Sequence, residues 1–171
     1  MEPTLSQLRQ SWQHVSEGDG GHCPVCDRWG KVYSIHLTGS MVRALGWLYK
    51  ESQITGERWV NVPTTAPRTV MRSYSITSLK YWGFVEQRPP EKKVQGEKKT
   101  EAKTRTSGYW AITEAGKQFL INQQSVPDRA FVYADTVRGY GMQTVYAKEV
   151  MDKKFDYDAM MADIYALSQT P

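Results

Sequence analysis

A polar stretch near the middle of the chain constrains the fold more than any other feature. Residues 89–108, "PPEKKVQGEKKTEAKTRTSG", contain almost no large apolar side chains, so this stretch cannot contribute much to a buried core. Two short apolar segments flank it, "FVEQR" (84–88) and "YWAIT" (109–113), and both are typical of β-strands. The pattern therefore predicts two strands joined by a long polar loop.

The helices on either side of this predicted hairpin have recognisable ends. Apolar residues recur every third position up to Trp82, and Gly83 stands where that helix would stop, because glycine enters the left-handed region at no steric cost. After the second strand, Thr113 is a suitable N-cap for a helix over 114–124. The residues expected on the inward face of that helix are Ala115, Phe119 and Leu120.

The segment before the hairpin predicts a helix, a short strand and a second helix. In "SMVRALGWLYKESQ" (40–53) apolar residues recur at i, i+4 and i+7, which indicates an amphipathic helix that Ser40 can cap. "RWVNV" (58–62) predicts a short strand, and Pro67 is placed to begin a helical turn or two. The full order is helix, strand, two short helices, strand, long loop, strand and helix.

This order and two local motifs resemble the winged-helix modules of the MarR and PadR type. Such modules typically contain "L-x-x-x-G-(L/F)-(V/I)" before the wing and "Y-x-(L/I)-T-x-x-G" after it. The matching residues here are Leu79, Gly83, Phe84, Val85, Tyr109, Ile112, Thr113 and Gly116. The resemblance covers residues 39–124 and implies an α+β winged helix-turn-helix, a fold that serves both DNA and protein partners. The whole chain also looks like small proteins carried by bacteriophages and prophages.

The resemblance implies a DNA-binding surface, because in winged helices the helix before the hairpin enters the major groove and the wing contacts the backbone. Residues 1–124 hold 17 Lys+Arg against 11 Asp+Glu, a net of +6, whereas residues 125–171 hold 5 against 7. The expected reading surface consists of Arg68, Arg72, Ser73, Ser75, Thr77, Ser78 and Lys80. The expected wing cations are Lys92, Lys93, Lys98, Lys99, Lys103 and Arg105. A solvated loop of mixed charge explains the wing composition equally well.

Both cysteines of the chain lie in "GGHCPVCDRWGKVY" (20–33), spaced Cys-x-x-Cys. Cys23 and Cys26 are compatible with a structural zinc site, with a redox dithiol, or with two simple free cysteines. A zinc site needs two further ligands from His14, His22, His36, Asp27 or a partner chain, and His36 and His14 are the better geometric candidates. Zinc is therefore the expected cofactor, in a small knuckle ahead of the winged helix.

The remaining sequence predicts a three-part chain. Residues 1–38 form an N-terminal extension with a helix over 1–19 and a strand at 31–37, residues 39–124 the winged helix, and residues 125–171 a packing or dimerisation segment. That last segment is expected to hold one strand at 130–141 and helices at 144–155 and 156–167. Asp156 is expected to cap the second helix, whose buried face contains Tyr157, Met161 and Ile164.

Several classes of function find no support in the sequence. No P-loop, G-x-S-x-G, H-E-x-x-H or G-x-G-x-x-G motif is present, so we expect a protein that is not an enzyme; an enzymatic role would rest on the dithiol alone. No apolar run approaches the length of a membrane span, and the start lacks a secretion pattern, which favours the cytoplasm of a bacterial host. The acidic residues Asp152, Asp156, Asp158 and Asp163 are interpreted as helix caps and solvated faces. Double-stranded DNA is the expected partner, with a host protein as the alternative and a homodimer as a further expectation.

Overall fold

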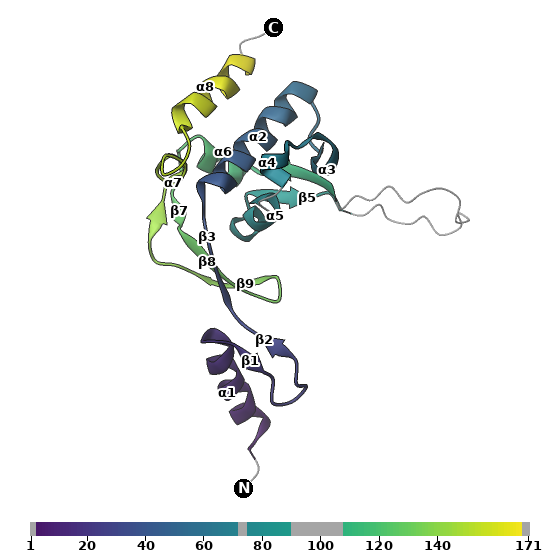
Figure 1. Ribbon diagram of the computed structural model, residues 1–171, viewed down its shortest axis with the longest axis vertical. Helices are drawn as coiled ribbons and strands as arrows, with labels where there is room; N and C mark the ends of the chain where they lie inside the picture. Colours follow the sequence, from purple (N-terminus) through teal and green to yellow (C-terminus); the bar gives the residue numbers. More distant parts are fainter. Residues whose placement is uncertain (1–2, 72–74, 90–107, 169–171) are drawn as a thin grey trace, which may run out of the picture. The chain divides into compact units, whose positions relative to one another are not determined.

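The computed structural model describes residues 3–71, 75–89 and 108–168, and it is a mixed α+β structure of helices and small antiparallel sheets (Figure 1). The chain forms two compact units. The first unit contains residues 1–36 and 127–144, and the second contains residues 37–126 and 145–171. The segment expected as one C-terminal part, 125–171, is therefore shared between the two units.

The first unit joins the N-terminal region to a hairpin from much later in the sequence. Its elements are α1 (Leu5–Glu17), β1 (Gly21–His22), β2 (Trp29–Gly30), β3 (Tyr33–His36), β8 (Arg129–Tyr133) and β9 (Thr136–Tyr140). β1 pairs with β2, and β3, β8 and β9 form an antiparallel sheet in that order. α1 is fixed by a backbone hydrogen bond from Val32 to Ser16 and by Trp12, which lies against Gly30.

The second unit is built around one long helix and a three-stranded sheet. Its first elements along the chain are α2 (Gly39–Thr55), β4 (Val60–Asn61), α3 (Val62–Thr65), α4 (Arg68–Met71), α5 (Ser75–Leu79) and the 3₁₀ helix η1 (Lys80–Trp82). They are followed by β5 (Val85–Gln87), β6 (Tyr109–Ile112), α6 (Glu114–Leu120), α7 (Ala147–Met151) and α8 (Tyr157–Ser168). The sheet order is β4-β6-β5, and both pairs are antiparallel. Two further short strands, β7 (Val126–Pro127) and β10 (Thr144–Val145), pair with each other.

The core of the second unit contains the apolar residues that the periodicity predicts. Leu45 and Leu48 of α2 are fully buried, and the Phe84 ring stacks on the Phe119 ring with their centroids 4.5 Å apart. α8 contributes the predicted apolar face, and the residues buried on it are Tyr157, Met161 and Ile164. α8 lies so close to α2 that a Cβ on Gly46 would be 2.5 Å from the sulfur of Met160.

Four helix details differ from the sequence-based expectation. The helix expected over 144–155 is shorter, because Thr144–Val145 form the strand β10 and α7 covers only Ala147–Met151. The N-cap of α2 is Thr38 and not Ser40, because the Thr38 side chain accepts a hydrogen bond from the Met41 amide and α2 begins at Gly39. Ala115 is exposed, and Gly116 takes its place on the buried face of α6. α4 begins at Arg68, one residue later than predicted.

The strand expectations were wrong in two places. β4 holds only two residues, because the chain turns into α3 at Val62. The single strand expected over 130–141 is a hairpin of β8 and β9, which turns at Ala134 and Asp135 with φ values of 47° and 63°. Two consecutive left-handed residues are typical of a type I′ turn, which Asn-Gly usually provides, and an Ala-Asp pair gives little indication of it.

Candidate functional site

The motif residues before and after the polar loop meet at one junction. Gly83 has φ of 69° and turns the chain from η1 into β5. The backbone amide of Phe84 donates to the Leu79 carbonyl at 3.2 Å, which closes the end of the helix. Across the sheet, the Thr113 hydroxyl donates to the Gly83 carbonyl at 2.6 Å, and the Thr113 amide donates to the Phe84 carbonyl at 3.0 Å. These bonds hold the two ends of the hairpin together.

Gly116 completes this junction by allowing a close approach. A Cβ on Gly116 would lie 2.3 Å from the Phe84 carbonyl oxygen, which is closer than any real side chain comes to backbone. The amide of Gly116 donates to the Thr113 hydroxyl at 3.1 Å, so Thr113 caps α6 as predicted. The Thr-x-x-Gly spacing therefore has a physical reason: the threonine begins the helix, and the glycine lets the helix pack directly on the chain at Phe84.

The strands of the hairpin lead to the segment between them. Val85 pairs with Ile112, and the ladder continues toward the loop. The Arg88 amide donates to the Tyr109 carbonyl at 2.9 Å, and the Arg88 guanidinium lies 5.6 Å from the centre of the Tyr109 ring. No motif in the sequence selects Arg88, although it lies directly before Pro89-Pro90, at the start of the polar segment.

The expected reading surface is assembled only in part. Arg68 on α4 and Thr77 on α5 are exposed, and Ser78 and Lys80 are half-buried. The Lys80 ammonium lies 5.3 Å from the centre of the Tyr81 ring. Ser75 is a correction: its side chain is only 2% exposed, because it lies on the same helical face as the buried Leu79, four residues later. The Ser75 hydroxyl therefore does not belong to this surface.

The other members of the predicted surface lie outside the described residues. They are Arg72 and Ser73 before α5, and Lys92, Lys93, Lys98, Lys99, Lys103 and Arg105 between β5 and β6. Their assignment to a DNA-binding surface stays a prediction from the sequence.

The two cysteines lie in the turn that joins β1 to β2 (Figure 1). Both are free thiols; Cys23 is half-buried and Cys26 is exposed. The backbone amides of Val25 and Cys26 hydrogen-bond to the Cys23 sulfur and hold the pKa of its thiol below the usual range. The Cys26 side chain also hydrogen-bonds to Cys23 and lowers this pKa further.

The predicted set of four zinc ligands is not brought together. Within residues 3–71, 75–89 and 108–168, no three His, Cys, Asp or Glu side chains form a group that could hold a metal ion. His14 is an exposed residue of α1, and His36 pairs with Arg129 in the sheet and has its Nε2 3.4 Å from the Ser34 hydroxyl. His22 has its Nδ1 2.8 Å from the Asp27 carbonyl, within the turn itself.

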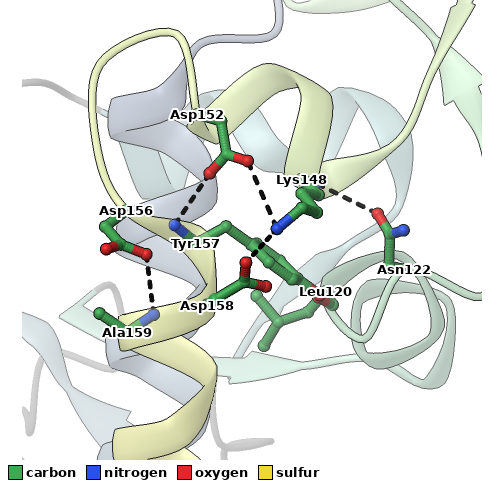
Figure 2. Close-up of polar contacts among 8 residues, drawn as sticks. All are labelled: Leu120, Asn122, Lys148, Asp152, Asp156, Tyr157, Asp158 and Ala159. Carbon is green, nitrogen blue, oxygen red and sulfur yellow. Dashed lines mark hydrogen bonds and ion pairs between the residues drawn. The ribbon is translucent and has the colours of Figure 1, made fainter.

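The acidic residues of the C-terminal helices form a polar network (Figure 2). Asp152 accepts a hydrogen bond from the Tyr157 amide at 3.0 Å. Asp152 and Asp158 both form ion pairs with Lys148. The hydrogen bond to Asp158 is the main cause that raises the pKa of the Lys148 ammonium. The Tyr157 hydroxyl donates to the Leu120 carbonyl at 2.6 Å. Together these contacts attach α7 and α8 to the end of α6.

The same region contains the predicted cap of α8. Asp156 accepts a hydrogen bond from the Ala159 amide at 2.9 Å, as Figure 2 shows. Asp163, further along the helix, pairs with Lys50 of α2 at 3.4 Å. These acidic side chains therefore act in capping and in packing α8 against α2.

Comparison with known proteins gives no relative from which a function could be inferred. No protein-family model matches the chain, and neither a curated protein nor a solved structure matches it. In the part of the chain that the structure describes, none of the helices combines the length and the apolar character needed to cross a membrane.

Proposed function

We propose that the chain is a winged helix-turn-helix protein that binds duplex DNA through α4, α5 and η1 together with the basic segment between β5 and β6. The proposal rests mainly on the architecture of the second unit. A helix, a strand, short helices and two further strands follow one another, and the last strand lies between the other two in the order β4-β6-β5. The junction at Gly83, Thr113 and Gly116 supports the same reading, because it explains both motifs of the resemblance.

The charge distribution supports DNA as the partner. The six cations between positions 91 and 105 outnumber the three glutamates there, which gives that segment a net of +3. Neutralising phosphates with such side chains provides sequence-independent affinity and makes binding sensitive to salt. Arg68 and Thr77, which are exposed, suit contacts with phosphate oxygens or base edges. Backbone contacts therefore supply most of the affinity in this proposal.

A binding titration with matched variants tests the proposal. Fluorescence anisotropy of a labelled mixed-sequence duplex should show binding near a micromolar dissociation constant at about 50 mM salt and much weaker binding at about 200 mM. Arg68→Ala and Lys80→Ala should each weaken binding several-fold. Lys153→Ala removes the same charge from the loop between α7 and α8 and should leave binding nearly unchanged. Equal effects of all three substitutions, or no salt-sensitive binding, would contradict the proposal.

A protein partner is the second candidate function, and one observation favours it. The α5–η1 segment carries a single cation, Lys80, and that ammonium already lies over the Tyr81 ring. A reading helix with so little charge suits a mainly apolar or neutral partner surface. Affinity capture from a bacterial lysate separates the two candidates: a stoichiometric protein that remains after nuclease treatment favours this one, and a partner lost with the nucleic acid favours DNA.

A further inference from the structure

The first unit contains a hollow of about 420 Å³ at the end of the β8–β9 hairpin that lies away from its turn. Its lining includes the side chains of Asp128, Arg129, Phe131, Tyr140 and Met142. All of them belong to residues 127–144, so the hollow lies within one compact unit. Natural ligand pockets have volumes of about 300–1,000 Å³, and this hollow is therefore large enough to hold a side chain of a partner.

Three of the lining side chains favour an aromatic ring as the occupant. Phe131 is half-buried, Tyr140 is 46% exposed, and Met142 is the most exposed large apolar side chain in the described part of the chain. Aromatic rings pack favourably on other aromatic rings, and the thioether of methionine makes favourable contacts with the edge of a ring. A ring in the hollow would meet both kinds of partner and would remove part of the exposed Met142 side chain from water.

An ion pair provides the polar part of the lining. The Arg129 guanidinium donates to the Asp128 carboxylate through Nε at 3.2 Å and through Nη2 at 3.1 Å. Both side chains lie over Gly141, because a Cβ on that glycine would be 2.6 Å from the Asp128 carboxylate and 2.7 Å from Cγ of Arg129. The Arg129 side chain is 37% exposed, so its Nη1 can donate to an acceptor of the occupant, such as a backbone carbonyl.

The hollow adjoins the outer strand of a sheet, which favours an extended peptide as the occupant. In the described sheet the order is β3-β8-β9, and an outer strand directs part of its backbone N–H and C=O groups away from the sheet, where an added strand can pair with them. The register shift of the β8–β9 pair lies between Phe131 and Val132, and Gly139 pairs with Phe131 on the side of the hollow. A Cβ on Gly139 would meet nothing within 4 Å, and an aromatic residue of a neighbouring strand can cover such a glycine.

The charge of β9 indicates a second property of the peptide. Its residues Thr136–Tyr140 contain one charged side chain, Arg138, which is exposed. The Arg138 guanidinium lies 5.4 Å from the centre of the Tyr133 ring, and Tyr133 is on the same face of β8 as Phe131, two residues away. An acidic side chain two residues from the aromatic one would lie on this same face and would complement Arg138.

We propose that β9 and the hollow beside it bind an extended segment of a partner protein. The segment adds to the sheet at β9, places an aromatic side chain in the hollow against Phe131 and Met142, and places an acidic side chain near Arg138. Backbone hydrogen bonds supply affinity, and the hollow selects the aromatic residue. The site uses only residues of the first unit and is independent of the proposed binding of DNA by the second.

Nuclear magnetic resonance of the full chain with ¹³C-labelled methionine methyl groups tests this proposal. The probe is an end-blocked pentapeptide of sequence Thr-Phe-Val-Glu-Thr, which has the aromatic and acidic residues two positions apart. The Met142 methyl signal, assigned with Met142→Ala, should move upfield in the ring current of the probe, with a dissociation constant of about 1 mM or below. The signal of Met160, which lies against Gly46 in the second unit, should stay in place. No movement of the Met142 signal, or equal movement of both signals, would overturn the proposal.

Changes in the peptide test the same site without altering the protein. Alanine in place of the phenylalanine should weaken binding roughly tenfold, the value of about 1.4 kcal/mol, and lysine in place of the glutamate about two- to fivefold. Equal affinities of the three peptides would overturn the proposal. If β9 instead pairs with β9 of a second copy, the mass in solution should double at the same concentration and the peptide should not bind, which would also overturn it.

Two matched variants complete the test. Met142→Ala should weaken binding of the phenylalanine peptide several-fold, and it should fold normally because the side chain is fully exposed. Ile54→Ala, at an apolar side chain of α2 that is 57% exposed, should leave binding unchanged. Arg138→Ala should remove the preference for glutamate over lysine. Binding to Met142→Ala as tight as to the wild type, or an unchanged preference in Arg138→Ala, would contradict the assignment of these residues to the site.

Discussion

At the scale of single residues, the close packing of α6 against Phe84 explains why the motif has glycine at position 116. α6 packs so closely on the chain at Phe84 that only hydrogen fits in place of a side chain. The carbonyl it would meet is backbone and is fixed by the hydrogen bond from the Thr113 amide, so it cannot move aside as a flexible side chain could. Gly116 is therefore a packing requirement of the junction.

We predict that Gly116→Ala destabilises the second unit. Alanine favours a helix over glycine by about 1 kcal/mol, but forcing a Cβ against backbone costs about 1–3 kcal/mol and should dominate. Thermal and urea denaturation measure the difference. Gly139→Ala is the control, because a Cβ there meets nothing within 4 Å, and it should change stability little. A Gly116→Ala protein as stable as the wild type would show that the close packing of α6 is not present.

Tyr157 gives a prediction that depends on pH. Its hydroxyl donates to the Leu120 carbonyl. Burial first, and then the charges of Tyr165, Asp158 and Asp152, raise its pKa from 10.0 to about 12. The folded state therefore keeps the proton longer than the unfolded state does, so this contribution is complete below pH 10 and is lost as the pH rises toward 12.

Tyr157→Phe should accordingly lower the free energy of unfolding by about 0.5–1.5 kcal/mol at neutral pH, the value of one hydrogen bond. The difference from the wild type should shrink between pH 10 and pH 12. Urea denaturation at a series of pH values measures it. Tyr33→Phe, at a tyrosine that is 56% exposed, should show no such difference, and a Tyr157→Phe difference that grows with pH would contradict the assignment.

At the scale of secondary-structure elements, the hairpin ends at β5 and β6 depend on one threonine. The Thr113 hydroxyl caps α6 by accepting from Gly116 and also donates to the Gly83 carbonyl on the neighbouring connection. We predict that Thr113→Ala costs about 1–2 kcal/mol of stability. Calorimetry measures the melting temperature of this variant. Thr144→Ala, at an exposed threonine in β10, is the control, because it removes the same methyl group and hydroxyl without removing a helix cap. Equal melting temperatures for both variants would exclude the capping role.

Local patterns in the sequence predicted these elements correctly, but they did not predict which distant strands pair. The sequence correctly predicted three features that depend only on neighbouring residues. They are the helix end at Gly83, the helix cap at Thr113 and the buried face that begins at Tyr157. The pairing of Tyr33 with Val132 joins strands about a hundred residues apart, and no local pattern encodes it. The assignment of 127–144 to the first unit depends on that pairing.

The candidate sites show the same division between local and distant information. The Cys-x-x-Cys spacing places both free thiols in the short turn between β1 and β2. His36 and His14 were expected to be the better geometric partners of the cysteines, but no group of three metal-ligating side chains forms among the described residues. Ser75 was misplaced for a related reason: α5 is only five residues long, and its first residue lies on the buried face.

At the scale of the whole molecule, the proposed function assigns the excess of basic residues to contacts with DNA phosphates. The sequence carries a net charge of +4, with the excess of cations in residues 1–124. If the segment between β5 and β6 contacts phosphates, replacing its six cations by serine should reduce both the affinity for DNA and its dependence on salt. Circular dichroism before and after the change provides the control for folding.

The slope of log K against log salt for the wild-type chain on duplex DNA is the strongest test of DNA binding. Each phosphate neutralised by a cation contributes about −0.9 to this slope. We predict a slope of about −3 or steeper, and a shallower slope after the six cations are replaced. Binding that does not change with salt, or no binding near micromolar protein at low salt, would contradict DNA as the partner.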